Sequence, residues 1–348
     1  MLERLGINAK EAEKTLMVAS SEKKNQALKK IAEGLIENTD KIIEANKVDL
    51  ENGEKNGMAK SMLDRLKLDK ERIEGMAKGV LDVATLPEPV GRILSATERP
   101  NGLRIEKVST PIGVIAVIFE ARPNVTSDAA ALCLKSGNTV ILRGGKEAIN
   151  SNKTIAKVMR QAVKEAGMPE DVIQLVEDTS RESANELMKM NEYVDVLIPR
   201  GGAGLIQAVV KNATVPVIET GVGNCHIYID KNADLKKAVD IVFNAKTSRP
   251  SVCNAAESLL IHKDIAKEAL VAIKNKLDEK DVTLVGDSKA REIIPDMEKA
   301  ISAKRICTMY SEKMQIFPDI WNMVDITIRS GQTVLIRRFL PMQTGGCG

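Results

Sequence analysis

The sequence predicts an α/β protein of two domains, in which helices cover a parallel sheet on both faces. Short, continuous apolar runs alternate with amphipathic segments through the middle of the chain, a pattern that is typical of buried parallel strands joined by helices. The length of 348 residues suits two domains of ordinary size.

The N-terminal 86 residues are predicted to be helical. No proline occurs before Pro87, and Leu28, Ile31, Leu35 and Ile42 recur at helical spacing between polar residues. We expect this block to be a helical layer over a sheet.

A hairpin is predicted at about 93–110, because Asn101-Gly102 favours a tight turn between two short extended runs. Strand-like runs then occur at 112–118, 139–142, 172–176, 194–198, 215–218 and 226–229. A second unit is predicted from residue 233, with a helix, a strand, a helix at 264–279, another strand and a short helix. We therefore assign residues 1–232 to a first domain and 233–302 to a second, smaller α/β domain.

Residues 303–348, the tail, differ in composition from the rest of the chain. They carry six basic and three acidic residues, which equals the net charge of +3 of the whole protein, and four of its eight aromatic residues.

Composition excludes several classes of function. Lys and Arg number 51 against 48 Asp and Glu, so the charge is too small for binding nucleic acid by phosphate neutralisation. The longest uncharged apolar run, 108–119, falls short of the roughly 20 residues of a membrane span. The N-terminus has no apolar signal core, so we expect a cytoplasmic protein.

Neither a disulfide framework nor a metal site is predicted. The cysteines are odd in number, widely spaced and form no CxxC pair, and there are only two histidines. The five cysteines are Cys133, Cys225, Cys253, Cys307 and Cys347.

Cys253 is a candidate nucleophile. It lies in a Pro-containing turn after Lys246 and Arg249 and before a helix-prone pair of alanines, and positive potential or helix N-terminal amides stabilise a thiolate. The alternative is an inert, packed thiol.

Glycine-rich turns follow two of the predicted strands. Gly201 and Gly202 come directly after one strand and before a helix, where backbone amides bind a pyrophosphate. Lys146 follows another strand after two glycines and suits a ribose phosphate, although a solvated lysine is the alternative.

Polar side chains follow two further strands. Glu219, beside glycines, suits a base or a ribose ligand, or else caps the next turn. Asn124 suits an oxyanion donor and Arg122 an anion clamp, whereas the alternative for Asn124 is a cap of a helix from Thr126. Together with the thiol, these strand-end turns favour a nucleotide-dependent enzyme with a covalent step.

Four segments carry a resemblance to a known family: PIGVIAVIFEARPNVTSDAAALCLKSGNTVILRGGKEA, VLIPRGGAGLI, VIETGVGNCHIYID and NAKTSRPSVCNAAESLL. Over about residues 1–302 the chain resembles the gamma-glutamyl phosphate reductase (glutamate-5-semialdehyde dehydrogenase) branch of the aldehyde dehydrogenase superfamily. The resemblance implies a Rossmann-like cofactor domain, a catalytic domain with the cysteine and an oligomerisation hairpin. It also implies NADPH-dependent reduction of L-glutamyl 5-phosphate to glutamate 5-semialdehyde, in proline biosynthesis.

The resemblance also implies roles for individual residues. Cys253 matches the nucleophile that forms a thioester, and Asn124 would hold the oxyanion with the Cys253 amide. Lys146 matches the position near the adenosine ribose, where a cation suits the 2′-phosphate of NADPH, and Gly201 and Gly202 match the pyrophosphate turn.

Three further residues complete the expected site. Glu219 matches the glutamate that activates water in hydrolytic relatives, but a reductase must not hydrolyse its thioester, so we expect it at the cofactor instead. Arg122 and Arg249 are our candidates for binding the substrate's phosphate or carboxylate.

The chain departs from the family after about residue 302. The family continues with the rest of the catalytic domain and with a strand that pairs with a neighbouring subunit, and the tail offers no counterpart. A frame change or gene fusion would explain the shift in composition, and we expect impaired activity and loss of the usual homo-oligomeric pairing. The alternatives are a catalytically dead nucleotide-binding remnant and another acylating aldehyde dehydrogenase, for example one that uses a CoA thioester.

Overall fold

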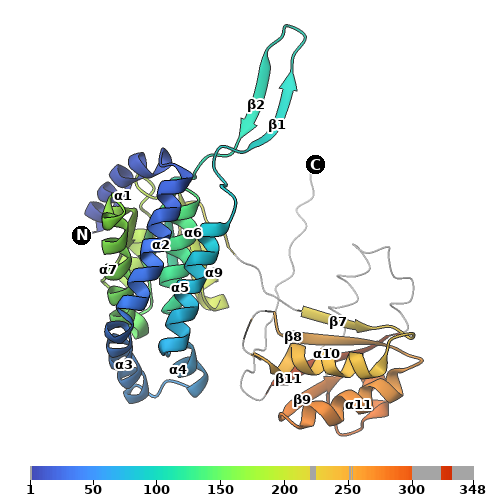
Figure 1. The fold of residues 1–348 in the computed structure, drawn as a ribbon. Helices are drawn as coiled ribbons and strands as arrows, with labels where there is room; N and C mark the ends of the chain where they lie inside the picture. The colour runs from blue at the N-terminus through green and yellow to red at the C-terminus, as the bar shows by residue number, and fades with distance from the viewer. Residues whose placement is uncertain (1, 220–224, 251, 253, 300–322, 331–348) are drawn as a thin grey trace. The chain divides into compact units, whose positions relative to one another are not determined.

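The computed structural model describes residues 2–219, 225–250, 252, 254–299 and 323–330 (Figure 1). The chain divides into two compact units, Met1–Thr220 and Gly221–Gly348. Each unit is described by itself below.

The first unit begins with five helices, so the helical character that the apolar spacing predicts for this block is confirmed. Side chains cap two of them: Ser20 accepts the Lys23 N–H, and Asp69 accepts the Arg72 N–H, each satisfying an otherwise unpaired donor of the first turn. The helices are α1 (Leu2–Met17), α2 (Ser21–Glu37), α3 (Thr39–Lys55), α4 (Lys60–Leu66) and α5 (Lys70–Thr85).

The predicted hairpin is confirmed. Strands β1 (Ile93–Glu98) and β2 (Arg104–Val108) pair antiparallel, and Gly102 has φ +80° in the turn between them, a conformation that glycine adopts without strain. Every residue of both strands is exposed.

A four-stranded parallel sheet forms the centre of the first unit. Its order is β5-β4-β3-β6, with β3 (Val114–Phe119), β4 (Thr139–Arg143), β5 (Ile173–Leu175) and β6 (Val196–Arg200). The connections contain α6 (Asn124–Lys135), η1 (Lys146–Ala148), α7 (Ile149–Glu165), η2 (Glu170–Val172), α8 (Arg181–Leu187) and α9 (Ala203–Asn212).

Side chains of β3 alternate between the two faces of this sheet. Ile115, Val117 and Phe119 belong to one hydrophobic cluster, and the intervening Val114, Ala116 and Ile118 belong to another. A strand that is buried on both faces has this continuous apolar sequence.

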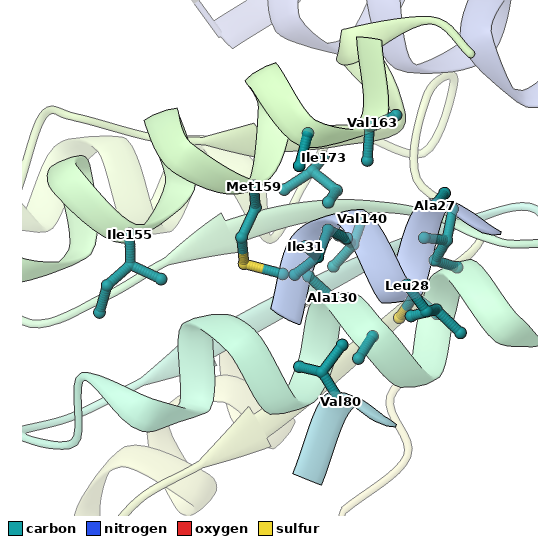
Figure 2. Packing of buried hydrophobic residues seen from close by; sticks show 14 of the residues in the cluster. Ala27, Leu28, Ile31, Val80, Ala130, Val140, Ile155, Met159, Val163 and Ile173 are labelled. Carbon is teal, nitrogen blue, oxygen red and sulfur yellow. The ribbon is translucent and has the colours of Figure 1, made fainter. Parts of the chain in front are cut away.

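The first cluster lies among helices α2, α5, α6 and α7 and strands β3 to β5, and it also includes Ala12 and Leu16 of α1 and Ile42 of α3 (Figure 2). Leu28 and Ile31 of α2 are fully buried in it, with Ile155 and Met159 of α7. The second cluster holds Leu2 and Ala9 of α1 with residues of α8 and α9. The N-terminal block is therefore not one layer, because α1 packs on the sheet while α2 and α5 pack on α6 and α7.

The second unit has a five-stranded mixed sheet of order β10-β9-β11-β8-β7. Its strands are β7 (Cys225–Ile229), β8 (Ala256–His262), β9 (Val282–Gly286), β10 (Glu298–Lys299) and β11 (Met323–Ser330), and its helices are α10 (Leu235–Thr247), α11 (Ala266–Asp278) and α12 (Ser288–Ile293). Strand β11, which belongs to the tail, pairs antiparallel with both β8 and β9. This part of the tail therefore contributes a strand to the sheet.

Two predicted strands differ in the structure. Residues 215–218 form only a bridge from Val217 to Leu197 of β6, since Pro216 has no N–H to donate. Residues 225–229 pair with β8 rather than with the first sheet. The division between units thus lies at 220/221, before the expected boundary at 232/233, because β7 belongs to the second sheet.

Among the described helices, none is long and apolar enough to cross a membrane.

Candidate active site

Three turns of the first unit meet at one edge of its sheet. Strands β3, β4 and β6 are parallel, with Ile118 opposite Arg143 and Phe119 opposite Arg200, so all three end at the same level. The turns that follow contain residues 120–123, 144–148 and 201–202. The carboxyl edge of an open α/β sheet is where ligands bind.

The turn after β4 presents Lys146. Gly144, two residues earlier, is buried. A side chain would not fit there, because its Cβ would collide with the side chain of Asn152 and lie 3.1 Å from Cζ of Phe119. A Cβ on Gly145 would collide with the carboxyl group of Glu147. Lys146 itself is exposed on η1, so its ammonium group is available to a ligand.

Glu147 ties this turn to the turn after β3. Its Oε1 accepts the backbone N–H of Ala121 at 2.6 Å. Ala121 has φ +22°, a conformation that is unfavourable for a residue with a Cβ. The hydrogen bond from Ala121 to Glu147 therefore supports a strained turn, and it leads directly into Arg122 and Asn124.

The turn after β6 opens helix α9. Gly202 is its N-cap residue, in extended conformation with φ −69° and ψ 166°, and no side chain of its own caps the helix. Instead, Oε2 of Glu120 accepts the Gly202 N–H at 2.8 Å. Gly201 and Gly202 are both exposed, as a turn that receives a phosphate group requires.

Asn124 is the first residue of α6, and its side chain does not cap the helix. Its Nδ2 donates to Oδ2 of Asp128 at 2.8 Å. The alternative, a cap of a helix from Thr126, is wrong because the helix begins two residues earlier. The protein around Asp128 desolvates its carboxyl group and raises its pKa, although the hydrogen bond from Asn124 opposes this shift. The amide of Asn124 has a second N–H for another acceptor.

A buried polar network fixes the start of α7, directly after Lys146 and Glu147. The N-cap residue Ala148 has no side-chain acceptor. Asp49 of α3 supplies one: its Oδ1 accepts from the N–H and Nδ2 of Asn150, and its Oδ2 accepts from the N–H and Oγ of Ser151. Asn46 also donates to Oγ of Ser151, at 3.0 Å.

Sequence analysis did not identify Glu120, Glu147 and Asp49. The sequence position of Glu120 and Glu147 could have identified them, since both are acidic residues next to the candidate residues of the turns after β3 and β4. Asp49 had none, because it contacts residues more than 100 positions away.

Arg143, the last residue of β4, is directed away from these turns. Its Nη2 donates to the carbonyl groups of Thr179 and Ser180, both at 2.8 Å. Burial lowers the pKa of this guanidinium group, and Glu147 and Asp178 oppose the shift.

The remaining predicted site residues lie at the end of the first unit and in the second. Glu219 is exposed, and so is Arg249, just after α10. Cys253 lies outside the described residues. Lys246, in the last turn of α10, is 2% exposed, and burial lowers its pKa although Glu257 lies 3.8 Å from its Nζ.

Acidic, histidine and cysteine side chains form no group of three suited to a metal ion anywhere in the described ranges.

Comparison with known proteins relates this architecture to one family. The aldehyde dehydrogenase family model matches residues 3–305. Gamma-glutamyl phosphate reductase of Clostridium botulinum (strain Eklund 17B / Type B) is 58% identical over 295 residues, which is 85% of this chain and 71% of that protein. The reductase of Heliobacterium modesticaldum is 55% identical over the same shares.

Solved structures also relate the chain to this family. The crystal structure of gamma-glutamyl phosphate reductase from Thermotoga maritima has a TM-score of 0.80 and 48% identity, covering 86% of this chain and 72% of its own. Propionaldehyde dehydrogenase of Rhodopseudomonas palustris with bound propionyl-CoA has a TM-score of 0.59 at 20% identity, covering 79% and 57%, a likeness of fold alone. The expected α/β fold and family resemblance are thereby confirmed.

Proposed function

Because the chain belongs to the aldehyde dehydrogenase family, we propose that it reduces L-glutamyl 5-phosphate to L-glutamate 5-semialdehyde with NADPH, releasing phosphate. It is an oxidoreductase with a nicotinamide cofactor, as its family implies. The observation that carries the proposed substrate is the identity of 55–58% with gamma-glutamyl phosphate reductases over about 85% of the chain. The solved structures of an acetylating aldehyde dehydrogenase and of a propionaldehyde dehydrogenase with bound propionyl-CoA are 20% identical to this chain, a likeness of fold alone.

The carboxyl edge of the first sheet fits a phosphorylated dinucleotide. Gly201 and Gly202 have no side chain beside the first N–H groups of α9, which suit a pyrophosphate once the Glu120 carboxylate has moved away from this turn. Lys146 offers an exposed cation on the neighbouring turn, and this charge favours the 2′-phosphate of NADPH over the hydroxyl of NADH. We also assign Glu219 to cofactor binding, on the ribose. When bound, the cofactor supplies a hydride.

Cys253 is the proposed nucleophile. Its thiolate attacks the acyl carbon, the C–O bond to phosphate breaks, and phosphate leaves as a thioester forms. The thioester carbon would accept the hydride that the bound cofactor supplies, and the resulting thiohemiacetal alkoxide would expel the Cys253 thiolate and leave the aldehyde. Lys246 and Arg249 precede this cysteine and supply positive charge to its turn.

Asn124 and Arg122 would act on the substrate from the turn after β3. One N–H of the Asn124 amide is engaged by Asp128, and the other donates to the oxyanion. Arg122 and Arg249 are the proposed cations for the substrate's phosphate and α-carboxylate.

The hairpin is the element through which a family member would contact a second copy of its chain. Its β1 and β2 are fully exposed and carry Ile93, Leu94 and Ile105 at 46–56% exposure, and exposed apolar strand surface is unfavourable in water. Homo-oligomer formation would cover it in the family, but we propose that this chain has lost the usual pairing, because residues 303–348 offer no counterpart of the family's pairing strand.

The test is NADP+-dependent oxidation of glutamate 5-semialdehyde in phosphate buffer, followed by NADPH absorbance. We expect turnover by the parent chain and by Cys133→Ala, but none by Cys253→Ala. Cys133 is the matched control because it is a buried cysteine of the first unit. Absence of turnover with NADPH still bound would instead identify a nucleotide-binding remnant, and turnover only with CoA would identify an acylating dehydrogenase.

A further inference from the structure

Glu120 occupies the helix N-terminus at which the pyrophosphate of the proposed cofactor would bind. Its backbone N–H donates to the carbonyl group of Arg200, the last residue of β6, at 3.3 Å. Its side chain reaches the next turn, where Oε2 accepts the N–H of Gly202 at 2.8 Å. An anion therefore already lies on the first free amide of α9.

The glycines of this turn fit the carboxylate closely. A Cβ on Gly201 would lie 2.5 Å from Oε2 of Glu120 and 2.8 Å from its Cδ. A Cβ on Gly202 would lie 3.7 Å from the same oxygen. Cδ2 of Leu205 would lie 2.7 Å from the Cβ on Gly201, so the space that residue 201 leaves by having no side chain is filled by Glu120 together with Leu205. In the proposed site, a phosphate group would approach these amides through this space.

We propose that the Glu120 carboxylate is an internal competitor for the cofactor's pyrophosphate, and that it sets the affinity of the site for the dinucleotide. This inference rests on the proposed function. Two anions cannot share the Gly202 N–H, because both are held there by the same donor and the same helix dipole. Glu120 is exposed, so a change of rotamer moves the carboxylate into water and frees the amide.

The competition has a measurable size. An apparent dissociation constant equals the intrinsic constant divided by the fraction of molecules whose site is open. If the carboxylate occupies the amide in about nine of ten molecules, its removal tightens binding about tenfold. A purely structural role predicts the opposite sign, because a glutamate that holds the turn in its binding geometry would weaken binding when it is lost.

The experiment measures binding, not turnover. NADPH and, separately, inorganic pyrophosphate are titrated calorimetrically into the full chain and into Glu120→Ala and Glu120→Gln. The matched control is Glu186→Gln, which removes one exposed carboxylate from α8 of the same unit. We expect both ligands to bind Glu120→Ala about tenfold more tightly, Glu120→Gln to be intermediate, and the control to match the parent chain. Circular dichroism establishes that each variant is folded.

Equal or weaker binding of both ligands by a folded Glu120→Ala chain would overturn the inference. Failure of the proposed function looks different. Tighter pyrophosphate binding by Glu120→Ala, with no binding of NADPH by any variant, would support the competitor role of Glu120 and overturn the cofactor assignment.

Discussion

Replacing Asp49 by alanine tests whether the start of α7 depends on a side chain from α3. Asp49 is 2% exposed and Ser151 is fully buried. The carboxyl group of Asp49 accepts four hydrogen bonds, at 2.6–3.2 Å, from the N–H and side-chain donors of Asn150 and Ser151. It thereby does for α7 what an N-cap side chain does for other helices.

The expected loss of stability follows from the hydrogen-bond donors that Asp49→Ala leaves without an acceptor. Water can reach half-buried Asn150, whereas the N–H and Oγ of Ser151 would lose this acceptor in a buried environment. At about 1–2 kcal/mol for each of these two buried donors, with about 1 kcal/mol for the lost cap, the free energy of unfolding should fall by about 3–5 kcal/mol. Asp49→Asn keeps one oxygen acceptor and should lose about half as much.

Urea unfolding followed by far-UV circular dichroism gives this loss. Hydrogen exchange of residues 149–165 attributes it to α7, since two units need not unfold in one transition. Glu51→Ala, an exposed carboxylate on the same helix, is the control and should change stability by under about 0.5 kcal/mol. A loss below about 1 kcal/mol in Asp49→Ala, with unchanged exchange in α7, would refute the reasoning.

Three further predictions follow from single side chains. Burial raises the pKa of Cys133 to about 12, so this thiol should not react with a disulfide reagent in the native chain, and Cys133→Ser should leave the native thiol titre unchanged. Burial lowers the pKa of Lys246 from its ordinary 10.5, so the unfolded state binds the proton more strongly. The positive charge of Lys246 therefore lowers the free energy of unfolding at neutral pH, and this cost disappears as the pH rises towards 10.5. We expect Lys246→Met to raise the melting temperature more at neutral pH than near pH 10.5. Gly145→Ala should weaken NADPH binding at least about tenfold in a titration, because its Cβ collides with Glu147; unchanged affinity would show that the turn adapts.

The alternation of strands and helices through the middle of the chain was predictable from the chain alone, whereas the bridge at 215–218 and strand β11 in the tail were not. A continuous apolar run such as 112–118 favours a strand buried on both faces, and the Asn101-Gly102 turn predicts its hairpin. A strand at 226–229 was predicted too, and the structure has it at Cys225–Ile229, but its sheet was not predicted. Pairing with Ala256–His262 depends on contacts between distant segments, and periodicity carries no such information.

The sequence by itself determined which residue types stand at the strand ends: Lys146 after two glycines, Gly201 and Gly202 before a helix, and Asn124 after β3. Only the tertiary structure decided what those turns contact. Parallel register brings three strand ends to one level, and there the carboxyl groups of Glu120 and Glu147 accept backbone N–H groups of neighbouring turns. The donor and acceptor of each bond are 26 and 82 positions apart along the chain. Whether such a bond forms depends on the distance between the two atoms in the folded chain, which spacing along the sequence does not give.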